Sequence, residues 1–343
     1  MKAVQVIAYG QPTEAIRVTD IAVPEPGPGE VRIAVKAASV NFGDIARTRG
    51  GVATLLQKPP FTLGMDVCGT VEATGAGAEE WLGRRVVAMT KMAFGGMAEK
   101  AIAPVSGVFD APPELDDAEA TAFLLPFHVS QLGLAVRAAL QAGETVLVTG
   151  GASGVGTAAV QLAAAHGARV IAHAGGPEKT ALCRNLGASA TIDHHQDNLF
   201  DRVMELTGGN GVNVTFDLVG GALTETLWNC MALEGRYLPA GFNNDAQGGF
   251  TGRPLRKIAL GNFSVIGVML SYGGPSPAAM RKMGMNQLPA SRGQQVHAAL
   301  CDLVAHGKIR PAIGRRIGMA EVAAILEDHE SRRTMGRTVV MVG

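Results

Sequence analysis

A glycine-rich stretch in the middle of the chain has the residue types and spacing of a phosphate-binding turn. It reads Thr149-Gly150-Gly151-Ala152-Ser153-Gly154-Val155-Gly156 and stands between an apolar, β-branched run and a segment rich in helix formers. Glycine lets the backbone turn tightly, and the N–H groups and dipole at a helix start favour an anion. The stretch therefore predicts a turn that binds a pyrophosphate.

The residues on both sides of this turn predict the β-α-β unit that a dinucleotide site requires. Residues 145–148 have the pattern of a buried strand, residues 157–164 that of a helix, and residues 169–174 that of a second strand. Because the chain has 45 glycines, the turn by itself could be an ordinary one. The strand, helix and second strand together favour dinucleotide binding.

Helix and strand patterns continue to alternate up to the strand predicted over residues 236–240. Alternation of this kind predicts a doubly wound parallel sheet covered by helices, which is a Rossmann domain in the α/β class. One of the later helices is predicted over residues 228–233, and residues 265–270 predict either an edge strand or a buried strand.

The end of the second predicted strand bears on which dinucleotide is bound. NAD sites usually place an acidic residue about twenty residues after the glycine turn, where it binds the ribose hydroxyls. This chain has Gly175, Gly176 and Pro177 there, followed by Glu178 and Lys179. Without a carboxylate at the strand end a 2′-phosphate meets no fixed repulsion, and Lys179 offers it a point charge. The sequence predicts NADPH, with Glu178 facing outward.

Composition excludes several other classes of protein. The 343 residues fit two domains, and 30 Lys+Arg balance 30 Asp+Glu, which leaves no basic excess for nucleic acid. No apolar stretch has membrane-spanning length, and the N-terminus lacks the apolar segment of a secretion signal. We expect a cytoplasmic protein. The four cysteines lie too far apart for a disulfide framework or a four-thiolate zinc lobe, at positions Cys68, Cys183, Cys230 and Cys301.

The segments before and after the nucleotide unit predict a second domain rich in strands. Strand-like alternation opens the chain, and an acidic helix start at residues 116–119 leads to a helix that we expect Pro126 to end. Residues 273–293 predict a loop. A helix over residues 294–306 and a strand over residues 338–342 then return to the first domain.

Over nearly its whole length the chain resembles the medium-chain dehydrogenase/reductase superfamily, in particular its zinc-independent quinone oxidoreductase branch, the zeta-crystallin-like reductases. The motifs that carry the resemblance are Val40-Asn41-Phe42-Gly43-Asp44, Gly64-Met65-Asp66 with Gly69-Thr70-Val71, Gly143-Glu144-Thr145-Val146-Leu147-Val148, Ala152-Ser153-Gly154-Val155-Gly156 and Leu233-Glu234-Gly235-Arg236. The segment 332–337 also resembles the closing segment of the family.

The resemblance implies the domain plan. It implies a GroES-like catalytic domain over residues 1–126, a Rossmann NADPH-binding domain over residues 127–267 and a return to the catalytic domain over residues 268–343. It also implies a homodimer in which edge strands of the two nucleotide domains join.

The resemblance also tests two other classes of dehydrogenase. Zinc-dependent alcohol dehydrogenases of the superfamily carry a cysteine in the 41–44 stretch and a His-Glu pair where this chain has Met65 and Asp66. Because catalytic zinc needs about three protein ligands, Asp44, Asp66 and Cys68 are a poor substitute, and we predict no metal. Short-chain dehydrogenases need a Tyr-x-x-x-Lys pair, which this chain lacks.

The resemblance further implies particular site residues. Lys179 and His194 match positions on the phosphate side, although a solvated helix lysine and a surface histidine are the alternatives. Asn41 and Ser130 match positions at the nicotinamide end, with Ser130 standing for the usual threonine; Asn41 could instead be a turn residue. The predicted cofactor-binding residues are Asn41, Ser130, Ser153, Gly154, Val155, Gly156, Gly175, Lys179, His194, Gly241, Phe242 and Thr334.

The expected chemistry is hydride transfer from NADPH to a quinone or an α,β-unsaturated carbonyl compound. The candidate catalytic residues are Asn41 and Tyr272, and Tyr272 could instead be a packed aromatic. Enoyl thioester reductases, the alternative enzyme, often have a tyrosine where this chain has residues 47–51, none of which is a tyrosine. An alternative of another class is a nucleotide-binding protein with a structural or regulatory role, as in the crystallin relatives.

Overall fold

The computed structural model describes residues 1–51, 57–241, 255–282 and 284–343. These residues form two compact units. Unit 1 comprises Met1–Leu125, Ser271–Val304 and Arg310–Gly343, and unit 2 comprises Pro126–Leu270 and Ala305–Ile309. The predicted boundaries lay at 126/127 and 267/268, and the assignment of 305–309 to unit 2 was not predicted.

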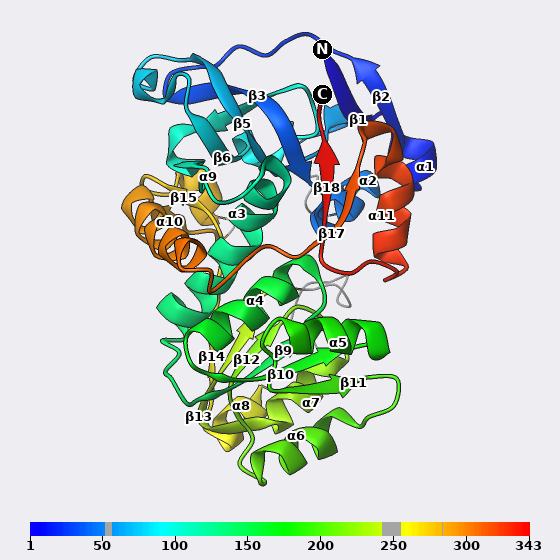
Figure 1. Cartoon of the computed structure of the whole chain (residues 1–343), viewed down its shortest axis with the longest axis vertical. Coiled ribbons are helices and arrows are strands. Elements are labelled where there is room, and N and C mark those ends of the chain that lie inside the picture. Colours follow the sequence, from blue (N-terminus) through cyan, green and yellow to red (C-terminus); the bar gives the residue numbers. More distant parts are fainter. Residues whose placement is uncertain (52–56, 242–254, 283) are drawn as a thin grey trace. The chain divides into compact units, whose positions relative to one another are not determined.

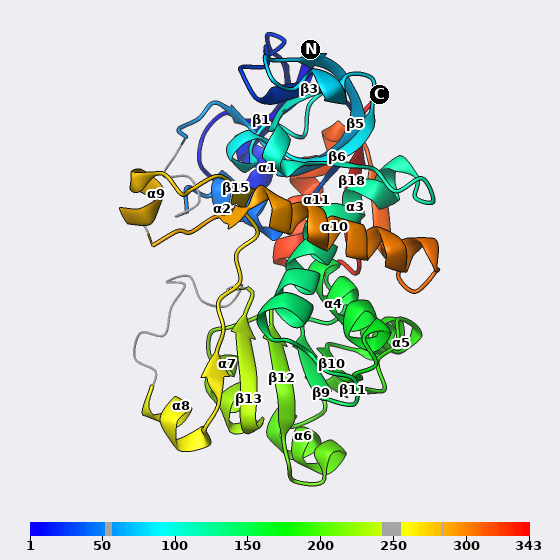
Figure 2. The same cartoon turned by 90° about the vertical axis from the view of Figure 1, so that its left-hand side faces the viewer.

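Unit 2 is built on a parallel sheet with the strand order β11-β10-β9-β12-β13-β14 (Figure 1). Its strands are β9 (Thr145–Thr149), β10 (Arg169–Ala174), β11 (Ala190–Asp193), β12 (Val212–Asp217), β13 (Met231–Pro239) and β14 (Ser264–Val265). Its helices include α4 (Gly154–Ala165), α5 (Pro177–Asn185), α6 (Leu199–Thr207), α7 (Leu223–Asn229) and α8 (Arg256–Gly261). Figure 2 shows α4 and α5 on one face of the sheet and α7 and α8 on the other. The predicted Rossmann fold is confirmed.

The sequence accounts for the central strand of this sheet. Val146, Leu147 and Val148 of β9 are all fully buried, because helices cover both faces of the strand. β9 pairs with β10 on one side and β12 on the other. The chain reverses its direction of travel across the sheet between β9 and β12, and ligands of open α/β sheets bind outside the strand ends at such a point.

Unit 1 contains the strand-rich GroES-like fold. One sheet has the order β17-β18-β3-β5-β6-β8, with β7 also pairing with β3, and a second sheet has the order β2-β1-β4. The strands are β1 (Lys2–Val6), β2 (Ile16–Asp20), β3 (Glu30–Ser39), β4 (Phe61–Thr62), β5 (Asp66–Thr74), β6 (Arg85–Met89), β7 (Lys100–Pro104), β8 (Val108–Asp110), β15 (Tyr272–Gly273), β16 (Leu288–Pro289), β17 (Ile313–Ile317) and β18 (Arg337–Met341). The helices are α1 (Pro12–Ala15), α2 (Phe42–Thr48), α9 (Ala278–Lys282), α10 (Ala290–Ala305, whose last residue belongs to unit 2) and α11 (Val322–Glu330). Helix α3 (Asp117–Gln131) begins in unit 1, and its residues from Pro126 onward, Ser130 among them, belong to unit 2.

Three predictions about single elements were wrong. Pro126 does not end its helix, because α3 runs through it and continues as a π-helical segment, Leu132–Arg137. A proline inside a helix costs about 3 kcal/mol, and the burial of neighbours such as Leu124 and Phe127 offsets that cost. Residues 231–233, predicted as helix, open β13. The predicted loop over 273–293 contains α9, β16 and the start of α10.

The last strand of the unit 2 sheet is shorter than the strand predicted over residues 265–270. Only Ser264–Val265 forms strand β14, and it pairs in parallel with β13 through Arg236 and Tyr237. β14 is the last strand of this sheet among the described residues. This position fits the edge interpretation of the run.

Candidate active site

The glycine-rich turn connects β9 to α4 as the sequence predicts. Ser153 is the N-cap of α4, and its Oγ accepts a hydrogen bond from the Gly156 N–H at 3.1 Å. A Cβ at Gly156 would overlap the Gly150 carbonyl oxygen, so only glycine fits there. Gly154 and Val155 open the helix, where N–H groups lack intrahelical partners. These four residues form a cradle that suits a pyrophosphate.

The end of β10 lies directly beside this turn. The Gly151 N–H donates to the His173 carbonyl of β10 at 3.0 Å. β10 then runs into Gly175 and Gly176, and Gly176 has a φ of 83°. The strand end therefore carries no carboxylate of its own.

Two histidines lie over Gly175, one of which sequence reasoning missed. A Cβ at Gly175 would stand 2.5 Å from His194 Cε1 and 2.8 Å from His195 Nε2, so both imidazoles lie against the glycine. His194 was predicted on the phosphate side and His195 was not, although its place next to His194 was the available signal. Both side chains are exposed, and Lys179 is partly exposed in the first turn of α5.

A carboxylate that contacts the turn at Gly175 and Gly176 belongs to Asp193 at the end of β11. Its Oδ1 accepts hydrogen bonds from the Gly176 N–H at 2.9 Å and the His195 N–H at 3.0 Å. These backbone hydrogen bonds lower the pKa of the Asp193 carboxyl. The carboxylate is thus engaged in fixing the two turns that carry Gly175 and His194.

A buried histidine, His173, lies beside His194. His173 is buried on β10, and its ring centroid lies 5.2 Å from that of His194. Burial, helped by His194, lowers the pKa of His173 to about 4. His173 is therefore neutral near pH 7 and serves as packing behind the more exposed imidazoles.

Ser130 lies near the end of α3 and is fully buried. Among the described residues its Oγ has no hydrogen-bond partner. An orphaned buried hydroxyl is rare and costs stability, and a bound ligand or water is one way to supply the missing partner. The π-helical segment that follows Ser130 is also a feature enriched at functional sites.

Two of the predicted residues follow β13, and the structure describes only the first of them. Gly241 follows β13, and a Cβ there would stand 2.5 Å from the Leu218 carbonyl oxygen, so the close approach to the end of β12 requires glycine. Phe242 lies outside the described residues. Sequence reasoning also missed Asp217 at the end of β12, although an acidic residue followed by Gly220 and Gly221 was a visible signal.

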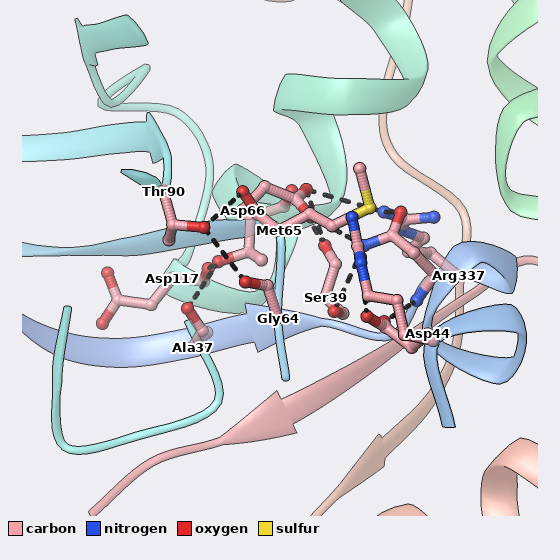
Figure 3. Close-up of polar contacts among 12 residues, drawn as sticks. Ala37, Ser39, Asp44, Gly64, Met65, Asp66, Thr90, Asp117 and Arg337 are labelled. Atoms are coloured by element: carbon pink, nitrogen blue, oxygen red, sulfur yellow. Dashed lines mark hydrogen bonds and ion pairs between the residues drawn. The ribbon is translucent and has the colours of Figure 1, made fainter. Parts of the chain in front are cut away.

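Asn41 belongs to a buried polar network in unit 1 (Figure 3). Its Nδ2 donates to Asp66 Oδ1 at 2.9 Å, and its Oδ1 accepts from Arg337 Nη2 at 2.7 Å. Ser39 Oγ donates to Asp66 Oδ2 at 3.0 Å, and Arg337 lies 3.5 Å from the same oxygen. The amide of Asn41 is therefore occupied by protein partners on both sides.

The same network extends into α2. The Asn41 N–H donates to Asp44 Oδ2 at 2.9 Å, and Arg47 Nη1 lies 3.2 Å from Asp44 Oδ1. Burial raises the pKa of the Asp44 carboxyl, and burial lowers the pKa of the Arg337 guanidinium. Two carboxylates and two guanidinium groups thus share one buried cluster that joins β3, α2, β5 and β18.

The remaining predicted residues of unit 1 lie apart from this network. Tyr272 is buried, packs edge-on against Phe109 with ring centroids 6.0 Å apart and lies against Gly293. Burial raises the pKa of its phenol. This environment favours the packed aromatic over the proton donor. Thr334 is partly buried between α11 and β18.

The donors in unit 1 do not suit a zinc ion. Asp66 is already bound by Arg337, Asn41 and Ser39, and burial raises the pKa of the Cys68 thiol to about 12 in the metal-free protein, so a zinc ion would have to displace its proton. Zinc binds the thiolate form of cysteine. Within the ranges that the structure covers, no cluster of three histidine, cysteine or acidic side chains is placed to bind a metal.

A cavity of about 290 Å³ opens elsewhere in unit 1. Its lining includes Met1, Ile21, Lys91, Phe94 and Ile102, and none of the predicted site residues. Within the described part of the chain no helix has the length and apolar character needed to cross a membrane.

The two folds and the cradle together define a class of protein, the medium-chain dehydrogenases and reductases. Two family descriptions match the chain: "Alcohol dehydrogenase GroES-like domain" over residues 27–113 and "Zinc-binding dehydrogenase" over residues 154–285. The first match falls within unit 1 and most of the second within unit 2.

Comparison with individual proteins narrows the class. The chain is 33% identical over 342 residues to a quinone oxidoreductase of Pseudomonas aeruginosa, covering 99% of each chain. It is 35% identical over 246 residues to a quinone oxidoreductase-like protein 2 homolog of Nematostella vectensis, covering 71% of this chain and 65% of that protein. The protein therefore belongs to the quinone oxidoreductase family of the medium-chain dehydrogenase/reductase superfamily.

Solved structures agree with this placement. A mycobacterial protein complexed with NADPH has 29% identity and a TM-score of 0.85, with 100% of both chains covered. A probable oxidoreductase from Mycobacterium abscessus has 33% identity and a TM-score of 0.82, with 100% of this chain and 99% of that chain covered. The fold of this chain is thus that of an oxidoreductase family.

Proposed function

We propose that the protein is an NADPH-dependent, zinc-independent reductase that transfers hydride to quinones or α,β-unsaturated carbonyl compounds. The observation that carries the proposal is the glycine cradle at the start of α4, set beside a strand end without a carboxylate. The relatives named quinone oxidoreductases and the NADPH complex of the mycobacterial protein support it.

The residues of unit 2 fit this dinucleotide. The cradle formed by Ser153, Gly154, Val155 and Gly156 would hold the pyrophosphate through backbone N–H groups. The orphaned Ser130 hydroxyl would bind the carboxamide of the nicotinamide, which removes the cost of its burial. When bound, NADPH supplies the hydride, and the protein positions the ring and keeps water away.

Selection of the 2′-phosphate rests on the end of β10. Gly175 leaves room for the imidazoles of His194 and His195, and Lys179 follows in the first turn of α5. These groups can donate hydrogen bonds or positive charge to a phosphate. The carboxylate of Asp193 is hydrogen-bonded to the backbone N–H groups of Gly176 and His195.

Zinc independence rests on the donor set of unit 1. The buried cation beside Asp66 is the guanidinium of Arg337, and the Cys68 thiol is buried and donates to Asp117. We expect turnover to be unaffected by prolonged dialysis against a chelator.

The proposal also includes the homodimer and the small-molecule substrate implied by the family resemblance. β14 pairs with β13 alone among the described residues, which leaves its other edge available for a second copy. Sedimentation equilibrium of the purified protein would test the dimer.

The direct test of activity is oxidation of NADPH by the purified protein in the presence of a simple quinone or an enone. The proposal predicts quinone-dependent or enone-dependent loss of NADPH absorbance. Binding of NADPH with no turnover on any quinone, enone or enoyl thioester would favour the structural or regulatory alternative.

A further inference from the structure

Asp217 lies at the end of β12, the strand next to the glycine turn, and its carboxylate is fully buried. Oδ1 accepts hydrogen bonds from Thr149 Oγ at 2.6 Å, the Val219 N–H at 2.9 Å and the Gly220 N–H at 3.1 Å. Oδ2 accepts from Tyr237 Oη at 2.6 Å. All four donor groups are neutral, so the buried carboxylate is held without a cation.

The donors come from β9, from β13 and from the loop that follows β12, at the point where the sheet order reverses. Thr149 ends β9 and Tyr237 lies on β13. The carbonyl oxygen of Asp217 also accepts from the N–H groups of Ala240 at 2.8 Å and Gly241 at 2.9 Å. One residue therefore fixes the carboxyl ends of β9, β12 and β13 relative to one another.

The loop that follows Asp217 borders the predicted cofactor site on two sides. A Cβ at Gly150 would stand 3.6 Å from Leu218 Cβ, and a Cβ at Gly241 would stand 2.5 Å from the Leu218 carbonyl oxygen. Thr149 Oγ also accepts the Leu218 N–H at 2.9 Å. Gly220 and Gly221 both have positive φ, at 65° and 64°, so the loop turns sharply there. The hydrogen bonds from the Val219 and Gly220 N–H groups to the Asp217 carboxylate hold this turn.

We propose that Asp217 is a positioning residue for the nicotinamide half of the dinucleotide. It holds Leu218, Val219 and Gly220 between the glycine turn and the end of β13, and so fixes the backbone that borders the proposed site. This inference rests on the proposed NADPH site. It assigns to Asp217 no contact with the cofactor, because its oxygens are buried and already bound.

The proposal predicts which half of the cofactor depends on Asp217. The residues facing the 2′-phosphate lie at the ends of β10 and β11, and none of the hydrogen bonds described above joins Asp217 to those residues. Loss of the carboxylate would remove the hydrogen bonds that hold the loop after β12. The hydrogen bonds from Gly176 and His195 to Asp193 would remain. Binding of intact NADPH should therefore weaken more than binding of its adenosine half.

The experiment compares Asp217→Ala with the wild-type chain by titration with NADPH and with adenosine 2′,5′-bisphosphate. We expect the Kd for NADPH to rise about tenfold or more, because the loop after Asp217 would no longer be held in the position that suits the nicotinamide half. The Kd for the fragment should change less than about twofold, because the turns at Gly175 and Asp193 stay in place. Asp217→Asn, which keeps one acceptor oxygen, should give an intermediate rise. Asp201→Asn, the same change at an exposed position of α6, is the matched control.

Several results would overturn the proposal. An unchanged NADPH affinity in Asp217→Ala would do so, and so would an equal rise for NADPH and the fragment, which indicates a general loss of structure. If Asp217→Ala does not fold, the same comparison is made on Asp217→Asn. Failure of the wild-type chain to bind either compound would instead contradict the proposed function.

Discussion

The two units each bury a carboxylate at the end of a strand or close to it, but they satisfy that carboxylate in different ways. In unit 2, Asp217 is surrounded by backbone N–H groups and the hydroxyls of Thr149 and Tyr237. In unit 1, Asp66 pairs with Arg337 and shares it with Asn41. The first arrangement fixes a loop, and the second joins secondary-structure elements.

The kind of donor around each carboxylate determines what each network can do. Neutral donors, among them the backbone N–H groups of Val219 and Gly220, hold the turn that follows Asp217 in one conformation. Paired ions need every donor satisfied, and the Nε atoms of Arg47 and Arg337 are buried without partners among the described residues. The unit 1 network joins secondary-structure elements through ion pairs, and the unit 2 network fixes the loop that we propose to border the cofactor site.

The largest expected effect is on the stability of unit 1. Arg337→Met removes the cation beside Asp66 and leaves a buried carboxylate without its counter-charge, which costs about 3–5 kcal/mol of unfolding free energy. Denaturant unfolding followed by circular dichroism would measure this. Arg333→Met is the matched control, because Arg333 pairs with Asp328 at the surface with 63% of its side chain exposed, and its loss should cost less than about 1 kcal/mol.

A double variant sharpens the same prediction. Asp66→Asn combined with Arg337→Met removes both charges and should be more stable than Arg337→Met alone, because no unpaired ion then remains. If the two substitutions instead add without coupling, the ion pair does not hold β5 and β18 together as described.

The second prediction concerns pH and one histidine in each unit whose pKa is lowered by burial, His173 in unit 2 and His329 in unit 1. Burial and His194 lower the pKa of His173 to about 4, and burial and Arg337 lower that of His329 to about 4. Between this pKa and the ordinary histidine value of about 6.5, the unfolded chain binds a proton that the folded chain does not. Stability should fall as pH decreases through that window, by at most about 3 kcal/mol for the fully buried case.

Non-titrating variants assign this pH dependence to the two units. His173→Gln should flatten the stability profile between pH 6.5 and 4 more than His329→Gln, because His329 is only partly buried. Unfolding free energies of both variants and the wild type across that range are the measurement. Parallel profiles for all three proteins would show that neither histidine is buried in its neutral form.

A smaller effect is expected at Ser130, and it separates binding from stability. Ser130→Ala removes a buried hydroxyl that has no partner, so the unfolding free energy should stay the same or rise by up to about 1 kcal/mol. The Kd for NADPH should rise about fivefold, the value of one lost hydrogen bond. Ser130→Thr keeps the hydroxyl and should keep the affinity. A clear loss of stability in Ser130→Ala would mean that the hydroxyl serves the fold.

The smallest effect is expected at Tyr272. Tyr272→Phe keeps the ring that packs against Phe109 and should change kcat by less than about twofold, whereas a general acid contributes about a hundredfold or more. Steady-state rates with a quinone at several pH values would measure this. A hundredfold fall in kcat would restore Tyr272 as the proton donor.

The sequence predicted the parts of the site that depend on local pattern. The strand, glycine turn, helix and second strand around Gly150–Gly156 follow each other along the chain, and glycine spacing reflects a local backbone requirement. The absence of an acid at the end of β10 was equally visible. Pro126 misled the prediction because the burial of α3 outweighs a local helix breaker.

What could not be predicted depends on residues far apart in the sequence. The pairing of Asp66 with Arg337 and the bond from Thr149 to Asp217 arise only when distant strands meet. Asn41 was assigned to the nicotinamide end by family resemblance, and only the fold reveals that its amide is bound by Asp66 and Arg337. Side-chain partners of this kind are set by tertiary packing, on which local periodicity carries no information.

The most direct test of the NADPH site is a pair of fluorescence titrations, with NADPH and with NADH, on the wild-type chain and on Lys179→Glu. We expect the wild type to bind NADPH more tightly than NADH, and Lys179→Glu to lose this preference because only its NADPH binding weakens. NADH binding that equals or exceeds NADPH binding in the wild type would contradict it.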